Sequence, residues 1–149
     1  MWGATDSRRF RPILTFDTVS LGEKIMSKNH EKEDRSNWTV QQWNDYANKG
    51  NKDLKGANLG GADLEGAFLE GANLEGANLY RAYLEGASLG GANLEGANLE
   101  GADLRRVWLE GANLKGANLE GADLEGANLR GALLEGHDID DLRKRVAGF

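Results

Sequence analysis

Leucine recurs at every fifth position from Leu54 to Leu134, and Ile139 extends the series. Residues 52–141 therefore form eighteen consecutive five-residue units, or pentads, of the type Ala-Asn-Leu-Glu-Gly. Alanine stands two positions before each leucine, with three exceptions at Lys52, Val107 and His137. Glycine stands two positions after it, with three exceptions at Arg81, Arg106 and Asp141. An internal repeat of this length constrains the fold more than any single motif does.

A five-residue period excludes both a packed α-helix and a long flat strand. On an α-helix, steps of five residues turn about 140° net, so the leucines would surround the helix instead of forming a stripe. In one continuous strand they would alternate between the two faces. The remaining solution is a short strand and a turn in every pentad. Alanine and leucine then point inward, asparagine and glutamate point outward, and glycine supplies the corner.

Repeated turning in one sense winds such a chain into coils, and successive coils pair as parallel strands about 4.8 Å apart. A small alanine beside a large leucine suits a narrow, closely packed interior. One coil cannot bury enough surface to stand alone, so the stability belongs to the stack, as in other solenoids.

These pentads resemble the A(D/N)LXX pattern of the pentapeptide repeat family over residues 52–141, about 60% of the chain. The resemblance implies an all-β fold, a right-handed quadrilateral parallel β-helix with four pentads in each coil. Eighteen pentads would make about four and a half coils, a rod of roughly 22 Å at the strand spacing. The periodicity alone does not fix the number of sides.

An open β-helix exposes strand edges and an apolar lumen at each end, so both ends are expected to be capped. Before the repeats, within residues 36–51, the capping-box spacing of Thr39 and Gln42 predicts a helix over about 39–49. Val40 and Trp43 of this helix would cover the first coil. After the repeats, residues 142–149 predict a short amphipathic tail that covers the last coil or forms a dimer contact. With Ile139, its apolar residues are Leu142, Val146 and Phe149.

Residues 1–35 lack periodicity and carry mixed charge, so a mobile leader is expected. One alternative is that Met26 is the natural start and that residues 1–25 do not belong to the natural chain. Arg8 and Arg9 faintly suggest a twin-arginine signal, but the stretch that follows is too short and polar for an apolar signal region. We therefore expect a cytoplasmic protein, with export to the periplasm or the thylakoid lumen as the alternative.

Few residues here are suited to catalysis. The chain has no cysteine and two histidines, His30 and His137, neither of which has an evident partner in the sequence. An acidic cluster lies near the end of the repeats, but it lacks the glycine and terminal glutamate of a calcium loop and is expected to be a solvated end. Its members are Asp138, Asp140 and Asp141. We expect no enzyme activity, no cofactor and no metal.

The outward positions carry most of the charge. Residues 52–141 hold 17 acidic and 7 basic residues, a net charge of −10 within a chain of net charge −6. With four pentads per coil, sides two and three would carry about −4 each, side one about −2 without Lys52, and side four about −1. On side three, Arg105 would lie between Glu85 and Glu125 and relieve the repulsion in that column. This balance argues against direct nucleic-acid binding.

The acidic rod permits a second interpretation, DNA mimicry. Some members of the family resemble DNA in shape and charge and bind DNA gyrase or other type II topoisomerases. A net charge of −10 over the expected rod is about one charge per 2.2 Å, near the value of about 1.7 Å for duplex DNA. The gyrase-binding members are longer rods that commonly place phenylalanine at the central inward position. Here that position is leucine, apart from Ile139.

One group of outward residues breaks the Glu-Gly monotony. Exposed aromatic residues beside arginine have the composition of interface hot spots, so we expect a protein-contact patch. Its residues are Phe68, Tyr80, Arg81, Tyr83, Arg105, Arg106 and Trp108.

From these observations we expect a non-catalytic, capped β-helix that acts as a protein-binding or scaffold module. Its partner would be an unidentified protein, with no membrane contact, and a homodimer through the C-terminal end is a further expectation. The alternative function is a DNA-mimicking inhibitor or protector of DNA gyrase or another type II topoisomerase. The resemblance is to a family that is abundant in cyanobacteria.

Overall fold

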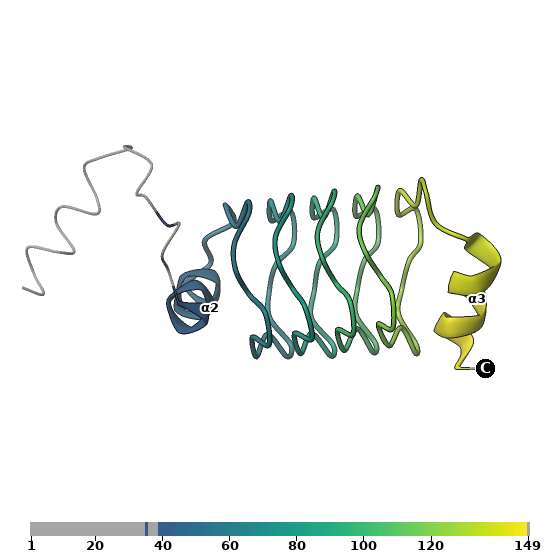
Figure 1. Ribbon diagram of the computed structural model, residues 1–149, viewed down its shortest axis with the longest axis horizontal. Helices are drawn as coiled ribbons and strands as arrows, with labels where there is room; N and C mark the ends of the chain where they lie inside the picture. Colours follow the sequence, from purple (N-terminus) through teal and green to yellow (C-terminus); the bar gives the residue numbers. More distant parts are fainter. Residues whose placement is uncertain (1–34, 36–38, 149) are drawn as a thin grey trace, which may run out of the picture. The chain divides into compact units, whose positions relative to one another are not determined.

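The computed structural model describes residue 35 and residues 39–148. Helix α2 (Val40–Asn48) and helix α3 (Ile139–Ala147) stand at the two ends of a stack of coils (Figure 1). The expected leader, apart from Arg35, lies outside the described residues, and so do His30 and Phe149. Within the described part of the chain, no helix is long and apolar enough to cross a membrane.

The coils repeat every twenty residues. Each parallel bridge joins a residue to the one twenty positions later, from Asp53 with Asn73 to Asn113 with Leu133. Twenty residues are four pentads, so the coil has four sides. The bridged residues define these sides: 53, 73, 93, 113 and 133 on side one; 58, 78, 98 and 118 on side two; 63, 83, 103 and 123 on side three; 68, 88, 108 and 128 on side four.

Each side contributes one bridged residue, not an extended strand of several. The reason is the turn that closes every pentad. The N–H of each inward alanine donates to the carbonyl of the leucine three residues before it, as from Ala97 to Leu94 at 3.0 Å. The residue between them, Gly96, has φ +65°, which is the geometry of a type II turn. A turn every five residues leaves only three residues extended.

In an interior pentad with asparagine or aspartate before the leucine, all five N–H groups find an acceptor. Three bonds cross to neighbouring coils, one closes the turn and one goes to a side chain. In the pentad 92–96 the bonds are Ala92 to Leu89 O (3.0 Å), Asn93 to Ala72 O (2.9 Å), Leu94 to Asn113 O (2.7 Å), Glu95 to Asn93 Oδ1 (3.2 Å) and Gly96 to Lys115 O (3.0 Å).

The bond from Glu95 to the Asn93 side chain explains why asparagine or aspartate precedes leucine so often. The side-chain oxygen accepts the N–H two residues later, which forms an Asx turn. The asparagine amide can also donate along the column, as Asn113 Nδ2 does to Asn93 Oδ1 at 3.1 Å and Asn78 Nδ2 to Asn58 Oδ1 at 3.1 Å. The outward asparagine is thus part of the fold as well as of the surface.

The interior is made of the alanines and leucines, as the pattern predicts. The twelve leucines from Leu54 to Leu109 are at most 1% exposed. Val107, which replaces an alanine, is fully buried as well. Since leucine and alanine alternate along every side, each layer packs a large residue beside a small one without a void.

Helix α2 covers the first coil, as the spacing of its apolar residues predicted. The capping box between Thr39 and Gln42 is formed, with the Thr39 N–H donating to Gln42 Oε1 at 2.8 Å. Trp43 is 5% exposed and Ala47 is 4% exposed, both within the core. The Arg35 guanidinium lies 4.3 Å from the ring centre of Tyr46, beside the same end.

The prediction of an eighteenth pentad is wrong, because helix α3 begins at Ile139. Asp138 caps this helix by accepting the N–H groups of Asp140 and Asp141 at 2.9 and 3.1 Å. Three aspartates at a helix N-terminus are also stabilised by the helix dipole. The repeats therefore comprise seventeen pentads, over residues 52–136, which is just over four coils instead of four and a half.

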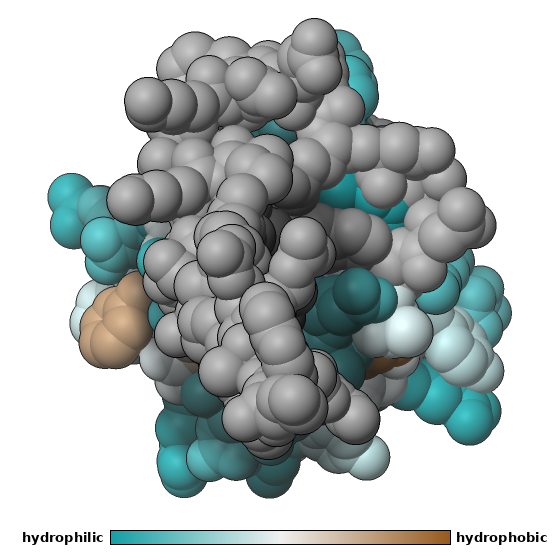
Figure 2. Space-filling view, turned by 90° about the vertical axis from the view of Figure 1, so that its left-hand side faces the viewer, coloured by the Kyte–Doolittle hydropathy of each residue, from teal (hydrophilic) through white to brown (hydrophobic). Residues whose placement is uncertain are grey.

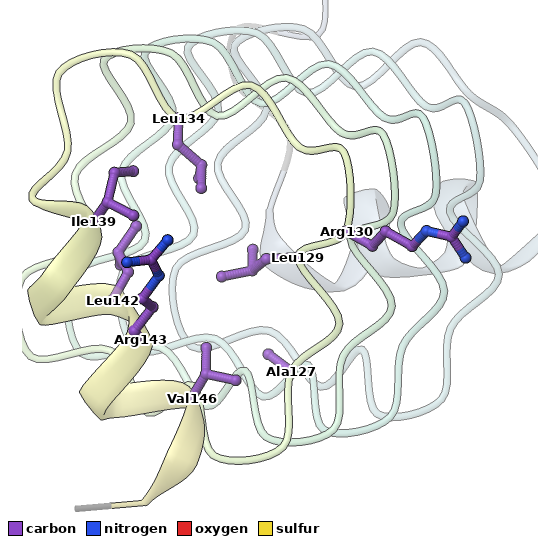
Figure 3. A pocket seen from close by; sticks show the side chains of 8 residues that line it. All are labelled: Ala127, Leu129, Arg130, Leu134, Ile139, Leu142, Arg143 and Val146. Carbon is purple, nitrogen blue, oxygen red and sulfur yellow. The ribbon is translucent and has the colours of Figure 1, made fainter.

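Helix α3 replaces the coil that would follow on sides two and three. Arg145 Nη2 donates to the carbonyls of Leu119 and Ala122 at 2.6 and 2.7 Å, and the Val146 carbonyl accepts from the Gly126 N–H at 2.9 Å. Leu142 is 3% exposed beneath the helix (Figure 3). His137, which had no partner in the sequence analysis, places Nε2 2.8 Å from the Leu114 carbonyl oxygen.

The turn geometry predicts opposite effects for one substitution at two glycines. At Gly96, φ is +65° and a Cβ would meet no atom within 4 Å, so alanine adds only backbone strain. We expect Gly96→Ala to lower the free energy of unfolding by about 1 kcal/mol. Gly90, which lacks a positive φ, is the matched control, and Gly90→Ala should raise it by up to about 1 kcal/mol. Urea denaturation measures both, and equal effects would contradict the turn assignment.

A candidate protein-binding surface

Side four carries two exposed aromatic residues in one column. Phe68 pairs with Ser88 and Ser88 with Trp108, so the two rings belong to alternate coils. At the strand spacing their backbones lie about 10 Å apart. Phe68 is 80% exposed and Trp108 is 57% exposed. Ser88 Oγ between them donates to Glu70 Oε1 at 2.6 Å, and Gly90 follows on the same side, so the two rings flank a position of small side chains.

The corner between sides two and three carries Tyr80 and Arg81. The Arg81 guanidinium lies 5.0 Å from the centre of the Tyr80 ring, within cation–π distance. Arg81 takes the corner position that glycine holds in most pentads, and its φ is +52°. Its side chain lies over the corner of the next coil, because a Cβ added at Gly101 would stand 3.3 Å from Arg81 Cγ. A residue other than glycine in the left-handed region is strained, and such strain is typical of functional positions.

The corner between sides three and four repeats this arrangement with Arg106. Its φ is +54°, and a Cβ added at Gly126 would lie 3.4 Å from Arg106 Cγ. The Arg106 side chain is 79% exposed, and Nη1 lies 3.4 Å from Glu85 Oε1. Arg81 and Arg106 are 25 residues apart, one coil plus one side. Each is followed two residues later by an exposed aromatic residue, Tyr83 or Trp108.

Side three, between these corners, joins Tyr83 to a cluster of ion pairs. Tyr83 is 58% exposed and bridges Asp63 and Asp103 in the outward column. Arg105 Nη2 lies 2.6 Å from Asp103 Oδ2 and 2.7 Å from Glu85 Oε2. The hydrogen bond from Arg105 lowers the pKa of Asp103 below its ordinary value, and the same contact raises the pKa of Arg105.

The expected column of Glu85, Arg105 and Glu125 is only partly correct. Arg105 pairs with Glu85, but its other partners in the described residues are Asp103 and, at 3.9 Å, Asp123. The Asp103 side chain lies two residues before Arg105 on the same side, so it is nearer than the next residue of the column. Arg105 is thus largely neutralised, whereas Arg81 and Arg106 keep exposed guanidinium groups.

The seven candidate residues therefore do not form one compact patch. They form a band that runs from the corner after side two, across side three, to side four. We call it the aromatic–arginine band; its residues are Phe68, Tyr80, Arg81, Tyr83, Arg105, Arg106 and Trp108. Glu85 links its two halves through Arg105 and Arg106. In Figure 2, a view from the N-terminal end, the coloured side chains around the grey residues are mostly hydrophilic, and a hydrophobic projection stands at one edge.

The charge map also changes with the boundary of the repeats. Residues 52–136 hold 14 acidic and 7 basic residues, a net charge of −7, because three aspartates belong to α3. Side two loses those aspartates and carries −1 instead of −4, so side three, at −4, is the one strongly acidic side. Asp140 and Asp141 pair instead with Arg143 and Arg145 at 3.3 and 3.2 Å.

The sequence analysis missed Leu133. This residue stands in the column of Asn73, Asn93 and Asn113 and is 56% exposed. The change from asparagine to leucine in an outward column was a readable signal, but only once the twenty-residue register was known. In the described residues, no group of three or more His, Cys, Asp or Glu side chains could hold a metal ion.

The repeats match a known protein family. The family model described as Pentapeptide repeats matches residues 53–91, 77–116 and 97–136, with eight copies. No curated protein matches the chain. Among solved structures, the chain is similar to alr5209, a pentapeptide repeat protein from Nostoc PCC 7120, with 35% identity, 70% of this chain and 92% of that chain covered, and a TM-score of 0.37.

Two further structures come from cyanobacteria. HetL, a pentapeptide repeat protein involved in heterocyst differentiation regulation in Nostoc sp. strain PCC 7120, is 47% identical over 53% of this chain, with a TM-score of 0.32. The matched region is 38% of the length of HetL. The pentapeptide repeat protein Rfr23 from Cyanothece 51142 is 30% identical over 64% of this chain and 92% of its own, with a TM-score of 0.31.

The ion pairs of side three predict a pH dependence. A lowered pKa of Asp103 in the folded chain adds stability above the ordinary aspartate range, and this contribution is lost as the pH falls through the folded pKa. In Arg105→Gln, the pKa of Asp103 should rise, and the variant should be less stable than the parent at pH 7. This difference should shrink below about pH 4. Carbon-detected NMR titration and denaturation at several pH values measure the two effects.

The matched control is Lys115→Gln. Lys115 lowers the pKa of Glu135 through a hydrogen bond and an ion pair at 2.8 Å. This variant should raise the pKa of Glu135 and leave that of Asp103 unchanged. If Asp103 titrated identically with and without Arg105, the described ion pair would not exist in solution.

Proposed function

Because the chain belongs to the pentapeptide repeat family, we propose that it is a non-catalytic module that binds a protein partner through the aromatic–arginine band. We infer that its coils form a right-handed, four-sided β-helix that serves as a rigid scaffold for this surface. The observation that carries the proposal is the exposure of Phe68 and Trp108, 80% and 57%, on the same side of the coils.

The composition of the band suits a protein interface. Tryptophan, tyrosine and arginine are the residues most enriched among interface hot spots, and all three occur here. The other bridged outward residues on coils two and three are Asn, Asp or Ser. Nothing inside the fold requires an aromatic ring at an outward position, since the turns and the ladder are formed without it. Exposed apolar area that does not stabilise the fold is typical of a contact site.

The two left-handed arginines give a second line of support. Glycine would fill both corners without strain, as it does at the other turns. Arg81 and Arg106 instead combine a strained backbone with an exposed guanidinium group, which for Arg81 lies 5.0 Å from the Tyr80 ring. Strain of about 1–2 kcal/mol at each site is more readily explained by binding than by folding.

The partner contact can be tested by affinity capture from the native host with the full chain as bait. The proteins retained by the parent chain are identified by mass spectrometry, and the recovered partner is then purified and titrated. We expect Trp108→Ala and Phe68→Ala each to weaken its binding at least thirtyfold, about 2 kcal/mol, as for a hot spot. Circular dichroism should be unchanged, because both side chains are exposed.

Two further variants make this test sharper. Arg106→Gly removes the guanidinium and gives the corner its usual residue, so weaker binding cannot result from a less stable fold. Glu120→Ala on side two is the control, because it changes an exposed residue outside the band. Equal binding by the parent, Trp108→Ala and Arg106→Gly would overturn the proposed surface.

The second candidate function is inhibition or protection of DNA gyrase or another type II topoisomerase by DNA mimicry. Its support is the acidic side three, with a net charge of −4. The lower net charge of the coils, −7, and the arginines of side three weaken this support. A supercoiling assay with the purified chain tests the second candidate: gyrase activity unchanged at micromolar concentrations of the chain excludes inhibition of gyrase.

The cellular compartment follows from neither candidate. We propose a cytoplasmic location, with export to the periplasm or the thylakoid lumen as the alternative. Fractionation of the native host with an antibody against the repeats would decide between these locations.

A further inference from the structure

The C-terminal end of the coils is only half covered. We call residues 127–135, which form sides four and one of the last coil, the C-terminal rim. Helix α3 covers the edges of sides two and three, through Arg145 and Val146, but no coil follows the rim. In Figure 3, α3 lies over one part of the opening, while Leu129 and Leu134 face an uncovered part.

The rim exposes the hydrogen-bonding edge of the ladder. One coil earlier, the N–H groups of Leu109, Gly111 and Leu114 donate to the rim carbonyls of Asn128, Arg130 and Leu133 at 2.8 to 2.9 Å. The corresponding N–H groups of the rim itself find no acceptor in the described part of the chain; they belong to Leu129, Gly131 and Leu134. An open edge of this kind is a template for another strand.

An apolar hollow lies beside this edge. It has a volume of about 320 Å³, and its lining includes Leu129, Leu134, Leu142 and Val146. Leu129 and Leu134 are half-buried, whereas the leucines of the inner coils are almost fully buried. The hollow is at the small end of the range for ligand sites, so it suits one or two aliphatic side chains.

Leu133 extends the apolar surface outward from the hollow. The three preceding coils place asparagine in this column, and the asparagines form a hydrogen-bonded series from Asn73 to Asn113. Leu133 ends that series and is 56% exposed. The last coil therefore has an exposed apolar side chain at the position where the preceding coils have an asparagine that bonds along the column.

Two arginines lie at the hollow, whereas the rim's one acidic residue, Glu135, is paired with Lys115 at 2.8 Å. Arg130 and Arg143 both line the hollow, and their side chains are 83% and 76% exposed. In Figure 3, Arg143 reaches over the opening and Arg130 points away from it. Arg130 already lies 4.0 Å from Glu110 of the preceding coil, which shows that a glutamate one rung away can pair with it. An occupant with a carboxylate over Arg130 would therefore find a partner there.

The size of the rim favours a peptide over a second copy of the chain. Nine residues fall well short of the 20–30 per partner that a stable protein–protein interface uses. A single added strand needs only the edge and a place for its inward side chains.

We propose that the C-terminal rim binds an extended peptide with the spacing Ala/Val-x-Leu-Glu-Gly, which adds a further coil segment on sides four and one. The backbone of this peptide accepts from the Leu129, Gly131 and Leu134 N–H groups and donates to the Ala127 and Ala132 carbonyls. Its leucines fill the hollow, and its glutamate pairs with Arg130. This proposal uses residues outside the aromatic–arginine band, so it does not depend on the proposed function.

The probe is a capped peptide with the sequence of residues 107–116, VWLEGANLKG, added to the full chain. In the register of the stack, its leucines lie over Leu129 and Leu134, and its glutamate lies over Arg130. Amide NMR should show shift changes confined to the rim and α3. Hydrogen exchange at Leu129, Gly131 and Leu134 should slow at least fivefold at saturating peptide.

A matched control changes only the peptide. In the control peptide, the backbone nitrogens of the tryptophan and the asparagine are methylated. These are the two groups that would donate to the Ala127 and Ala132 carbonyls, so both donors are removed. This peptide should bind at least tenfold more weakly, as should the parent peptide to Arg130→Glu. Shift changes elsewhere, equal binding of the methylated peptide, or no binding at 1 mM would overturn the proposal.

The same spectra test the other occupants. Rim shifts that depend on the concentration of the chain, with no peptide present, would assign the rim to a homodimer through the C-terminal end. Nuclear Overhauser effects from the Phe149 ring to the Leu129 and Leu134 methyl groups would assign the hollow to the chain's own end. Either result would overturn the assignment to a separate peptide.

Discussion

The structure depends on the pairing of backbone N–H groups in every pentad. Three donors reach neighbouring coils and one closes the turn, and the fifth goes to the outward asparagine or aspartate where the pentad has one, as in the pentad 92–96. A chain that turns a corner every five residues has no long strand or helix to satisfy these groups, so each unit must do so with its immediate neighbours. This requirement explains the asparagine or aspartate before most leucines and the glycine at the corner, whereas the inward alanine and leucine follow from packing.

The same requirement leaves the outer surface free to vary. An aromatic residue at an outward position costs one side-chain hydrogen bond at most, because the bonds between coils use the backbone. Phe68 and Trp108 therefore replace polar residues without disturbing the bridges of side four. The arginine corners are less free, since Arg81 and Arg106 keep the left-handed turn that glycine otherwise provides. The proposed contact residues are those that depart from the repeat.

The ends follow different physics from the coils. At each end the ladder stops, and a helix covers all or part of the exposed coil. Trp43 and Ala47 of α2 close the lumen with apolar surface, whereas Arg145 of α3 donates to two carbonyls of the last complete coil. The start of α3 inside the last predicted pentad shows how capping competes with periodicity. Asp138 can occupy the outward position of a pentad or cap a helix. The five-residue pattern predicts only the outward position, whereas the structure has the cap.

The sequence by itself determined the short strand and turn in every pentad, the inward leucines and the capping helix at Thr39, because each depends on spacing along the chain. The column that unites Phe68, Ser88 and Trp108 also requires four pentads per coil, which the family resemblance implied and the bridges show. Only the tertiary structure decided where the repeats end, which carboxylate pairs with Arg105, that the seven contact residues form a band, and that half of the last coil stays uncovered. These features depend on side chains from different coils and from α3, whose distances no local period encodes.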